Sequence, residues 1–301
     1  MNTILQYFMS VRTKTGDTYS IDKLILDFKL RYRSGGEWAA GFLSFLSDNS
    51  FVFFDHWTTS RIGTYREQFS IDCGDGNSFW VGVGLNEGTG RVINRVRLEF
   101  NPNKVAENRV FCLVFNQLFV FASGPPGVVR FDLAVDFPVL RSDCWLLKDR
   151  RMYEEVRKSD EDRTQYLGER NKPGRCKLYN KALESKLKHP LSRLEITISG
   201  DSMAYEQVLA IWPRVMVWDD LQLVFDDNVS GLTGTDRFIL KSLIMEPGRL
   251  DELARVKQKK IGCILDRYTR FIEIDKLVYE TIISQLYIYS QEIPWNGAGL
   301  Q

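Results

Sequence analysis

Short segments that alternate apolar and polar side chains run through the first two-thirds of the chain. Residues 23–30, 95–100, 130–137 and 191–198 each alternate in this way, and turns rich in Gly, Asn, Asp or Pro lie between them. A β-strand sends successive side chains to opposite faces, so each segment has one apolar and one polar face. The pattern predicts an α+β fold in which helices pack against an antiparallel sheet.

Apolar residues recur at helical spacing farther along the chain. Residues 105–123 fit a mostly buried helix or strand. From 235 to 265 the apolar positions fit three helices, and 268–274 fit a strand. Residues 278–289 are apolar without a clear period, so helix and strand both stay open.

The change of period predicts two domains. Residues 1–230 would form the sheet domain. Residues 231–301 would form a small helical domain that resembles a winged helix, with 268–274 as its wing strand. The boundary falls in residues 226–234, which are rich in Asp, Asn and Gly.

Composition narrows the class of protein. The 301 residues are 44% hydrophobic, which is enough for packed cores. No apolar run approaches the roughly 20 residues that cross a bilayer, and the first residues lack the basic head of a signal peptide. Five scattered cysteines without CxxC spacing are typical of reduced thiols. We therefore expect a cytoplasmic protein without a membrane partner. The net charge of +1 neither supports nor excludes nucleic-acid binding.

The polar positions of three alternating segments carry reactive groups. They are Arg130, Asp132 and Asp136 in the first, Lys177, Tyr179 and Lys181 in the second, and Arg193, Glu195 and Thr197 in the third. If these segments are neighbouring strands, one sheet face holds a phenol, three acids and several cations. That set of groups suits a metal-assisted attack on a phosphodiester.

These segments resemble the replication initiation factors of rolling-circle plasmids and filamentous phages, the trans-acting Rep family, which includes relaxases of some integrative conjugative elements. The matching segments are Arg130–Asp136 (RFDLAVD), Tyr166–Arg170 (YLGER), Leu178–Glu184 (LYNKALE), Arg193–Glu195 (RLE) and, more weakly, Arg97–Asn103 (RLEFNPN). They follow the family's order over about a third of the chain.

The resemblance implies a sequence-specific, metal-dependent DNA nickase that attaches to the 5′ end of the cut strand through a tyrosine. Tyr179 holds the matching position. The implied fold is a distorted relative of the His-hydrophobic-His endonucleases, but this chain has only His56 and His189, so the two-histidine metal motif is absent. A metal would therefore take oxygen ligands, which favours Mg²⁺ or Mn²⁺ over zinc.

The chemistry of the residues agrees with this interpretation. A phenol has a pKa of about 10. The nearby cations Lys177, Lys181 and Arg175 are expected to favour the phenolate. Lys181, Arg175 and Arg193 are the predicted stabilisers of the transition-state phosphate charge.

Asp132, Asp136 and Glu195 are the predicted metal ligands. Because acids at i and i+4 on a strand lie about 13 Å apart, we expect one of the two aspartates to act with Glu195, and the spacing does not choose between them. Glu99 and Glu184 are further candidate acids. The alternative is a solvated set of surface ion pairs, which needs no function.

Tyrosine chemistry also has alternatives. A tyrosine on a strand is commonly a cross-strand packing residue. Tyr166 is a rival nucleophile, although it has no cation two positions away in the sequence.

A second basic cluster lies at Arg255–Ile261 (RVKQKKI), at the start of the third expected helix. The first residues of a recognition helix enter the major groove. A solvated basic helix is the alternative. The predicted DNA-binding residues are Lys177, Lys257, Gln258, Lys259 and Lys260.

Together these features predict an origin-specific initiator of rolling-circle replication. It would bind a double-stranded origin, nick one strand at a single-stranded segment, and religate it through the phosphotyrosine. The resemblance implies a host helicase and polymerase as partners, and a homodimer. A conjugative relaxase is the alternative within the same chemistry, and a non-catalytic DNA-binding regulator is the alternative of another class.

Overall fold

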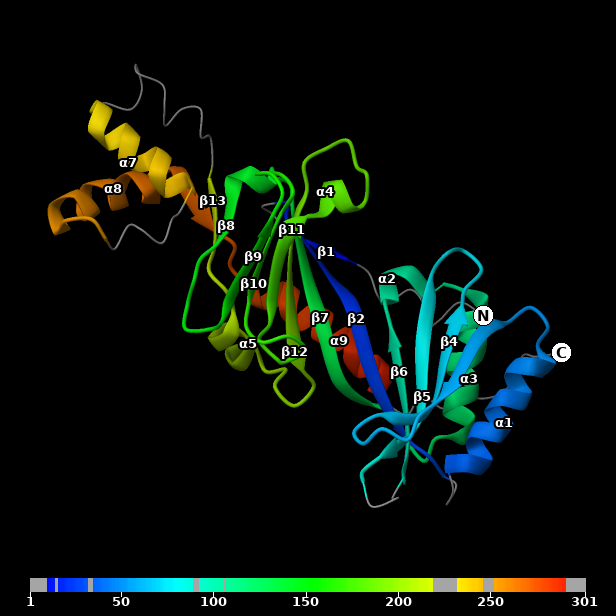
Figure 1. The fold of residues 1–301 in the computed structure, drawn as a ribbon. Helices are drawn as coiled ribbons and strands as arrows, with labels where there is room; N and C mark the ends of the chain where they lie inside the picture. The colour runs from blue at the N-terminus through cyan, green and yellow to red at the C-terminus, as the bar shows by residue number, and fades with distance from the viewer. Residues whose placement is uncertain are drawn as a thin grey trace.

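A large antiparallel sheet and a small three-stranded sheet organise the chain (Figure 1). The computed structural model describes residues 10–13, 16–31, 35–88, 92–105, 107–218, 232–245 and 252–290. The large sheet has eleven strands in the order β3-β4-β5-β6-β2-β7-β12-β11-β10-β9, with β1 paired to β2. The predicted α+β fold with an antiparallel sheet is confirmed.

The strands of the large sheet are β1 (Val11–Arg12), β2 (Thr18–Lys29), β3 (Phe53–Thr58), β4 (Tyr65–Asp72), β5 (Ser78–Asn86), β6 (Val92–Phe100), β7 (Gly127–Phe137), β9 (Tyr153–Arg157), β10 (Arg163–Leu167), β11 (Cys176–Asn180) and β12 (Ser192–Ser199). The helices that accompany it are α1 (Gly35–Asp48), α2 (Pro102–Val105), α3 (Arg109–Phe121), α4 (Lys181–Glu184), α5 (Tyr205–Ile211) and α9 (Lys276–Ser290). The small sheet comprises β8 (Cys144–Leu146), β13 (Val215–Trp218) and β14 (Thr269–Phe271), beside α7 (Gly234–Met245) and α8 (Arg255–Tyr268).

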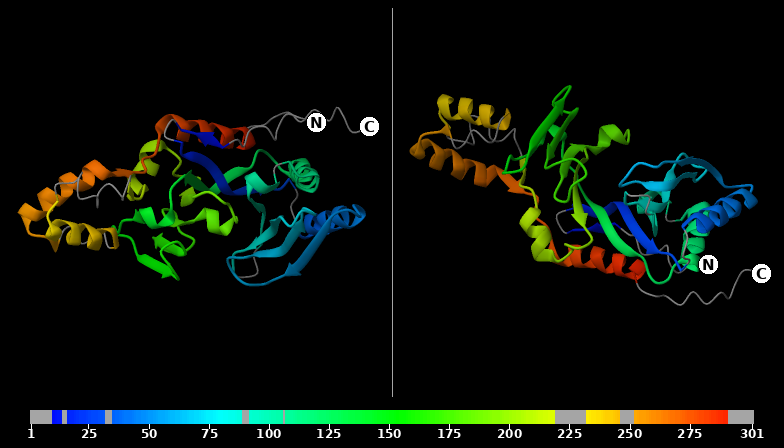
Figure 2. Two further views of the ribbon diagram at one scale, coloured as in Figure 1. Left: turned by 90° about the horizontal axis from the view of Figure 1, so that it is seen from above. Right: turned by 60° about the horizontal axis from the view of Figure 1, so that its bottom comes forward.

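One face of the large sheet is covered by helices. Side chains from α1, α3 and α9 share a single hydrophobic core with alternate residues of β2, β7, β11 and β12. Figure 2 shows α9 lying along one side of the long central strands. The opposite face of the sheet carries the polar side chains of the same strands, as the alternation predicts.

A β-bulge interrupts the pairing of β2 with β7. The register shifts between Ile21 and Lys23, so Asp22 is an extra residue in β2. Tyr19 and Ile21 are buried before the bulge, and Leu24 is buried after it. The bulge therefore changes the phase of the strand and leaves both Asp22 and Lys23 on the polar face.

Two undecided segments are helices. Residues 105–123 contain α3, whose first turn is capped because Asn108 Oδ1 accepts hydrogen bonds from the backbone N–H groups of Val110 (2.8 Å) and Phe111 (3.3 Å). The apolar residues 278–289 lie in α9, whose buried side chains pack into the core of the large sheet.

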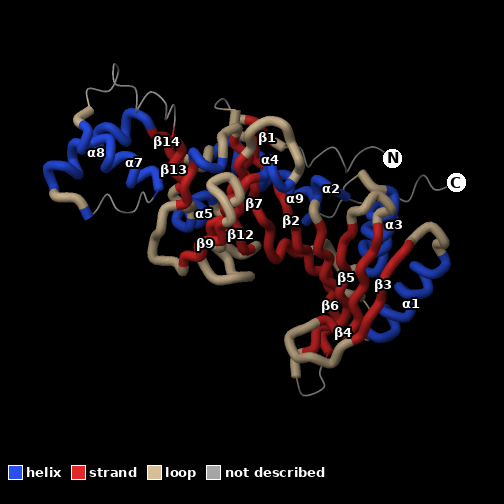
Figure 3. The backbone as a smooth tube through the Cα atoms, turned by 45° about the horizontal axis from the view of Figure 1, so that its top comes forward, coloured by secondary structure: helices blue, strands red, loops and turns tan. Residues whose placement is uncertain are grey.

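The C-terminal segments divide between two cores. α7 and α8 pack with Trp145, Met216 and Trp218 in a second hydrophobic cluster, next to the small sheet (Figure 3). The expected strand within 268–274 is present as β14. Of the three helices expected from 235 to 265, the described residues contain α7 and α8, and residues 246–251 lie outside them. α9 packs on the large sheet, and the predicted division of domains at residue 230 stays a prediction.

None of the helices in the described part of the chain is long and apolar enough to span a bilayer.

The close approach of β12 and β7 yields a test of the fold. A Cβ on Gly200 would lie 1.8 Å from the carbonyl oxygen of Val128, which is backbone and cannot swing aside. We expect Gly200→Ala to lower the free energy of unfolding by about 1–3 kcal/mol, measured by urea denaturation. The matched control is Gly41→Ala in α1, where the added methyl meets no atom within 4 Å. It should stabilise by about 0.5–1 kcal/mol. A Gly200→Ala variant as stable as the wild type would contradict this packing.

Candidate active site

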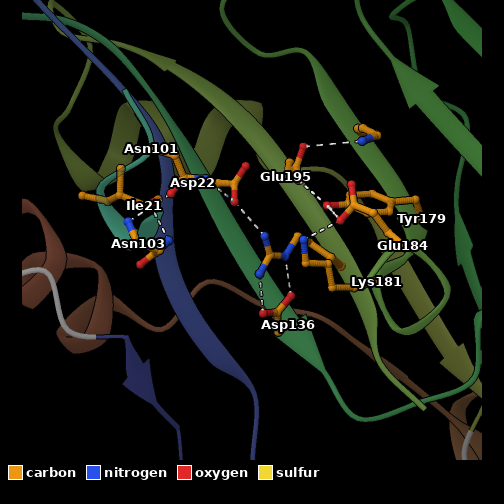
Figure 4. A network of polar contacts seen from close by, with 11 residues as sticks. Ile21, Asp22, Asn101, Asn103, Asp136, Tyr179, Lys181, Glu184 and Glu195 are labelled. Carbon is orange, nitrogen blue, oxygen red and sulfur yellow. Dashed lines mark hydrogen bonds and ion pairs between the residues drawn. The ribbon is translucent and has the colours of Figure 1, made fainter. Parts of the chain in front are cut away.

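Tyr179 lies on the polar face of β11, next to the acids and cations of β12. Its neighbour Leu178 is fully buried on the other face. Tyr179 pairs with Arg193 and Lys177 pairs with Glu195 across the two strands. The Tyr179 hydroxyl donates a hydrogen bond to Glu195 Oε1 at 2.6 Å (Figure 4). The phenol therefore points toward a carboxylate on the polar face and not into the apolar core.

Cations and a second acid cover the Tyr179 ring. The Lys177 ammonium lies 3.7 Å from the ring centroid and 3.9 Å from Glu195 Oε2. The Lys181 ammonium is 6.0 Å from the same centroid and forms an ion pair with Glu184. Glu184 Oε2 is 3.3 Å from the Tyr179 hydroxyl. These contacts leave Tyr179 only 6% exposed.

The environment raises the pKa of Tyr179. Burial is the largest cause, and the negative charge of Glu195 is the next. The expectation that the neighbouring cations favour the phenolate is wrong for this arrangement, because these two causes outweigh them. Burial also raises the pKa of Glu195, against the opposing effect of Lys177. The proton therefore rests on the phenol oxygen, with a carboxylate at hydrogen-bond distance.

Arg193 is held between two aspartates beside this pair. Its Nε and Nη2 donate to the two oxygens of Asp136 at 2.6 and 2.7 Å, and its Nη1 donates to Asp22 Oδ1 at 2.7 Å. Asp22 Oδ1 also accepts a hydrogen bond from Asn101 Nδ2 at 3.2 Å. The guanidinium is thus fixed on the same face as Tyr179, its partner across the two strands.

Asp22 and Asn101 are not among the residues that the sequence predicts for the site. The sequence holds one signal for Asp22, because the apolar phase changes between Ile21 and Leu24. A phase change in a strand predicts a bulge. Asn101 gives no such signal, since its approach depends on the pairing of β6 with β2.

The predicted metal ligands have separate partners. Asp132 accepts two hydrogen bonds from Arg130, at 3.1 and 3.2 Å, while Asp136 binds Arg193 and Glu195 accepts from Tyr179. Across the described residues no three His, Cys, Asp or Glu side chains are grouped so as to hold an ion. The side chains as arranged do not fit a divalent ion, and the Mg²⁺ or Mn²⁺ site stays a prediction.

Two further predicted residues lie away from Tyr179. Arg175 stacks over the ring of Tyr166 at 4.6 Å and donates to the Gly168 carbonyl at 2.6 Å. Glu99 forms an ion pair with Lys23 on β2. The rival Tyr166 therefore does have a cation nearby in space, although none is near in sequence.

The basic cluster of α8 contacts α7. Lys257 Nζ and Lys260 Nζ bind the two oxygens of Asp236, at 2.7 and 2.5 Å. Asp236 is fully buried, and its hydrogen bonds with the two lysines hold its pKa far below the usual range. Lys259 is exposed and Gln258 is partly exposed. Of the four residues of α8 predicted to bind DNA, Lys257 and Lys260 thus join α8 to α7. The DNA contacts of all four stay a prediction.

Comparison with known proteins finds similarity to solved structures. No protein-family model and no curated protein matches this chain. The chain is similar to a structure described as a rolling circle replication initiator protein from Geobacillus stearothermophilus, at 13% sequence identity and a TM-score of 0.35. The match covers 91% of this chain and 97% of that one.

The opposite pKa shifts of Glu195 and Glu184 predict opposite effects of pH on stability. The pKa of Glu195 is raised, so its contribution is present at low pH and is lost as the pH rises through its titration. Glu195→Gln should remove that loss, and the variant should gain stability relative to the wild type as the pH rises above about 4. Urea denaturation at a series of pH values measures this.

Glu184→Gln is the control of opposite sign. Burial is the largest single effect and would raise the pKa of Glu184, but the hydrogen bond and charge of Lys181 and the charge of Lys177 together outweigh it, so the pKa is lowered. Its contribution is present at neutral pH and is lost in acid, so this variant should lose stability relative to the wild type above about pH 4. The same sign for both variants would contradict the described charge arrangement.

Asp236 yields a test of the α7–α8 contact. Asp236→Asn removes the charge that binds both lysines, and we expect faster amide hydrogen exchange in α7 and α8 with unchanged exchange in β7 and β12. Because the pKa of Asp236 is lowered, the wild-type contact should persist as the pH falls through the usual carboxyl range. Lys259→Gln, which removes an exposed charge from the same helix, is the control. Equal exchange in the Asp236 variant and the wild type would contradict the contact.

Proposed function

We propose that this protein nicks one strand of DNA at a replication origin and starts rolling-circle replication, with Tyr179 as the nucleophile. The observation that carries the proposal is the hydrogen bond between the Tyr179 hydroxyl and Glu195, 2.6 Å long and shielded from water. A phenol that is paired with a carboxylate, with lysine ammonium groups beside it, suits proton transfer to that carboxylate during attack on a phosphate.

The proposed reaction is a transesterification. The Tyr179 oxygen attacks the phosphorus, its proton passes to Glu195, and the bond from phosphorus to the 3′ oxygen breaks. The products are a 5′-phosphotyrosine and a free 3′ hydroxyl, whose proton would come from the ammonium of Lys177 or Lys181. The phosphodiester energy is kept in the new bond, so the reverse reaction can religate the strand.

Positive charge beside the phenol supports the attack on an anionic phosphate. Lys177 lies over the ring and Lys181 lies beyond it. Asp136 and Asp22 hold Arg193 in place and partly neutralise its charge. Its guanidinium would therefore act on the phosphate from a fixed position, with less effect than a free cation. Arg175 contacts Tyr166, and its assignment to the reaction centre is the weaker part of the prediction.

DNA must displace part of the covering layer before it can reach Tyr179. Lys181 and Glu184 of α4 are among the residues that cover the phenol. Residues 183–190, at the end of α4 and after it, are exposed. Movement of this turn would lessen the burial of Tyr179 and withdraw Glu184, and both changes lower its pKa. The resting arrangement keeps the nucleophile protonated, and substrate binding would activate it.

A divalent ion, Mg²⁺ or Mn²⁺, is part of the proposal through the family resemblance alone. No step above depends on it. The double-stranded origin, the single-stranded nick site, a host helicase and polymerase, and a second copy of the chain are proposed partners on the same basis. A conjugative relaxase would use the same chemistry at a transfer origin.

A non-catalytic DNA-binding regulator is the second candidate. It is favoured by the ion pairs that occupy Asp132 and Asp136, because paired acids need no catalytic role. The two candidates differ in whether Tyr179 becomes covalently attached to DNA.

Tyr179→Phe discriminates between them. With supercoiled origin plasmid and Mg²⁺ or Mn²⁺, the variant should lose nicking and the covalent adduct completely while it keeps origin binding, because it lacks only the nucleophilic oxygen. A denaturing gel with labelled DNA measures the adduct, and addition of EDTA tests the metal. Tyr166→Phe is the matched control and should retain the adduct. Adduct formation by Tyr179→Phe, or none by the wild type, would refute the proposed role of Tyr179.

A further inference from the structure

The polar face that carries Tyr179 continues across β2 to the outer strands of the sheet. Trp57 of β3 pairs with Gln68, which pairs with Gly82, which in turn pairs with Arg97. Arg97 then pairs with Asp27 of β2. These residues form one row across five strands on the face opposite the helices.

An indole lies across this row because Gly82 has no side chain. A Cβ at Gly82 would be 2.2 Å from Trp80 Cη2 and 2.7 Å from Tyr65 Cγ. The Tyr65 ring supports Trp80 edge-to-face, with centroids 5.6 Å apart, and Arg97 stacks 5.3 Å from the Tyr65 centroid. Trp80 stays partly exposed, and Trp57 is 41% exposed.

The same end of the sheet has an excess of positive charge. Lys29 pairs with Arg95 in the ladder of β2 and β6, next to Arg97. Arg97 makes two hydrogen bonds to Asp27, at 2.8 and 3.0 Å, whereas Arg95 is 3.8 Å from that carboxylate and 43% exposed. Asp27 thus faces two arginines with Lys29 beside them, while Glu99, the cross-strand neighbour of Trp80, pairs with Lys23.

We propose that Lys29, Trp57, Trp80, Arg95 and Arg97, the Trp80 patch, bind single-stranded DNA that leads to or from the nick site. This inference rests on the proposed function for its substrate. Bases would stack on the two indoles and phosphates would contact Arg95 and Lys29. Aromatic platforms in a cationic groove bind single strands without sequence preference, because every base has a stacking face.

The chemistry and the geometry favour a single strand over a duplex. Bases in a duplex are stacked on each other and cannot reach an indole, whereas unpaired bases can. Five strand spacings separate β11 from β5 in the sheet order. At about 4.8 Å each they amount to about 24 Å. The row of Tyr179 crosses β2 at Thr18 and the row of Trp80 crosses it at Ile25, so the two sites are also offset along the strands by about 20 Å. An extended single strand of several nucleotides can cover both components along the sheet face.

The test measures binding of the full-length protein to a fluorescein-labelled oligo-dT of about 15 nucleotides. Trp80→Ala should raise Kd about 5- to 150-fold, and Trp80→Phe should raise it less because it keeps an aromatic face. Arg95→Ala, which removes an exposed side chain, should reduce the slope of log Kd against log salt by about 0.7. Phe238→Ala, which removes an exposed aromatic of α7, is the control and should bind as the wild type does.

Wild-type Kd values in Trp80→Ala and Trp57→Ala, or no oligo-dT binding by the wild type, would overturn the inference. A change of sedimentation in these variants without a change in Kd would assign the patch to contact between copies of the chain, and would also overturn the inference.

Covalent attachment of DNA to Tyr179 is measured in a separate assay. Loss of oligo-dT affinity in the variants without any adduct in the wild type supports the patch and refutes the nickase. An adduct with unchanged affinities does the reverse.

Discussion

The pairing of β2 with β7 is the constraint on which the sheet and the candidate site depend. β2 contributes buried residues of two phases, Tyr19 and Ile21 before the bulge and Leu24 after it. An unbroken strand would expose one of these sets to water, since a shift of one residue moves every side chain to the other face. The extra residue resolves the conflict. Asp22 therefore stands on the polar face, where it meets Arg193.

A network of fixed charges follows from this geometry. Arg193 is mostly buried, and its bonds to Asp136 and Asp22 keep it charged and oriented. In the adjoining pair of strands, β11 and β12, the Tyr179 hydroxyl donates a hydrogen bond of 2.6 Å to Glu195. Burial and the charge of Glu195 raise the pKa of Tyr179, so the resting protein holds a neutral phenol beside Glu195. In the proposed mechanism, this keeps the Tyr179 hydroxyl protonated until substrate binds.

The sequence predicts the faces of strands better than the partners of side chains. Period-two alternation was sufficient to place Leu194 in the core and Glu195 on the polar face. It did not indicate that Glu195 accepts the phenol proton, because that depends on rotamers and on which strands are neighbours. The segment that became α9 was undecided because apolar residues dominate it, although Glu280, Thr281, Ser284 and Gln285 recur in it at helical spacing.

Contacts between distant elements were also beyond the sequence. Asp236 binds Lys257 and Lys260, which are 21 and 24 residues away, through the packing of α7 on α8. From the sequence alone, a basic helix is expected to expose its cations to solvent. The buried carboxylate that binds two of them is visible only when the helices are placed side by side.

The net charge of +1 conceals an uneven distribution over the polar face. Near Tyr179 the charges are matched, since Arg130 pairs with Asp132 and Arg193 with Asp136. At the Trp80 patch the cations exceed the acids. Partly exposed ion pairs contribute only about 0–1 kcal/mol each, so a phosphate can compete for their cations at small cost. A nearly neutral protein can therefore present a cationic patch on one face, and total charge is a poor guide to polyanion binding when the charges are unevenly distributed.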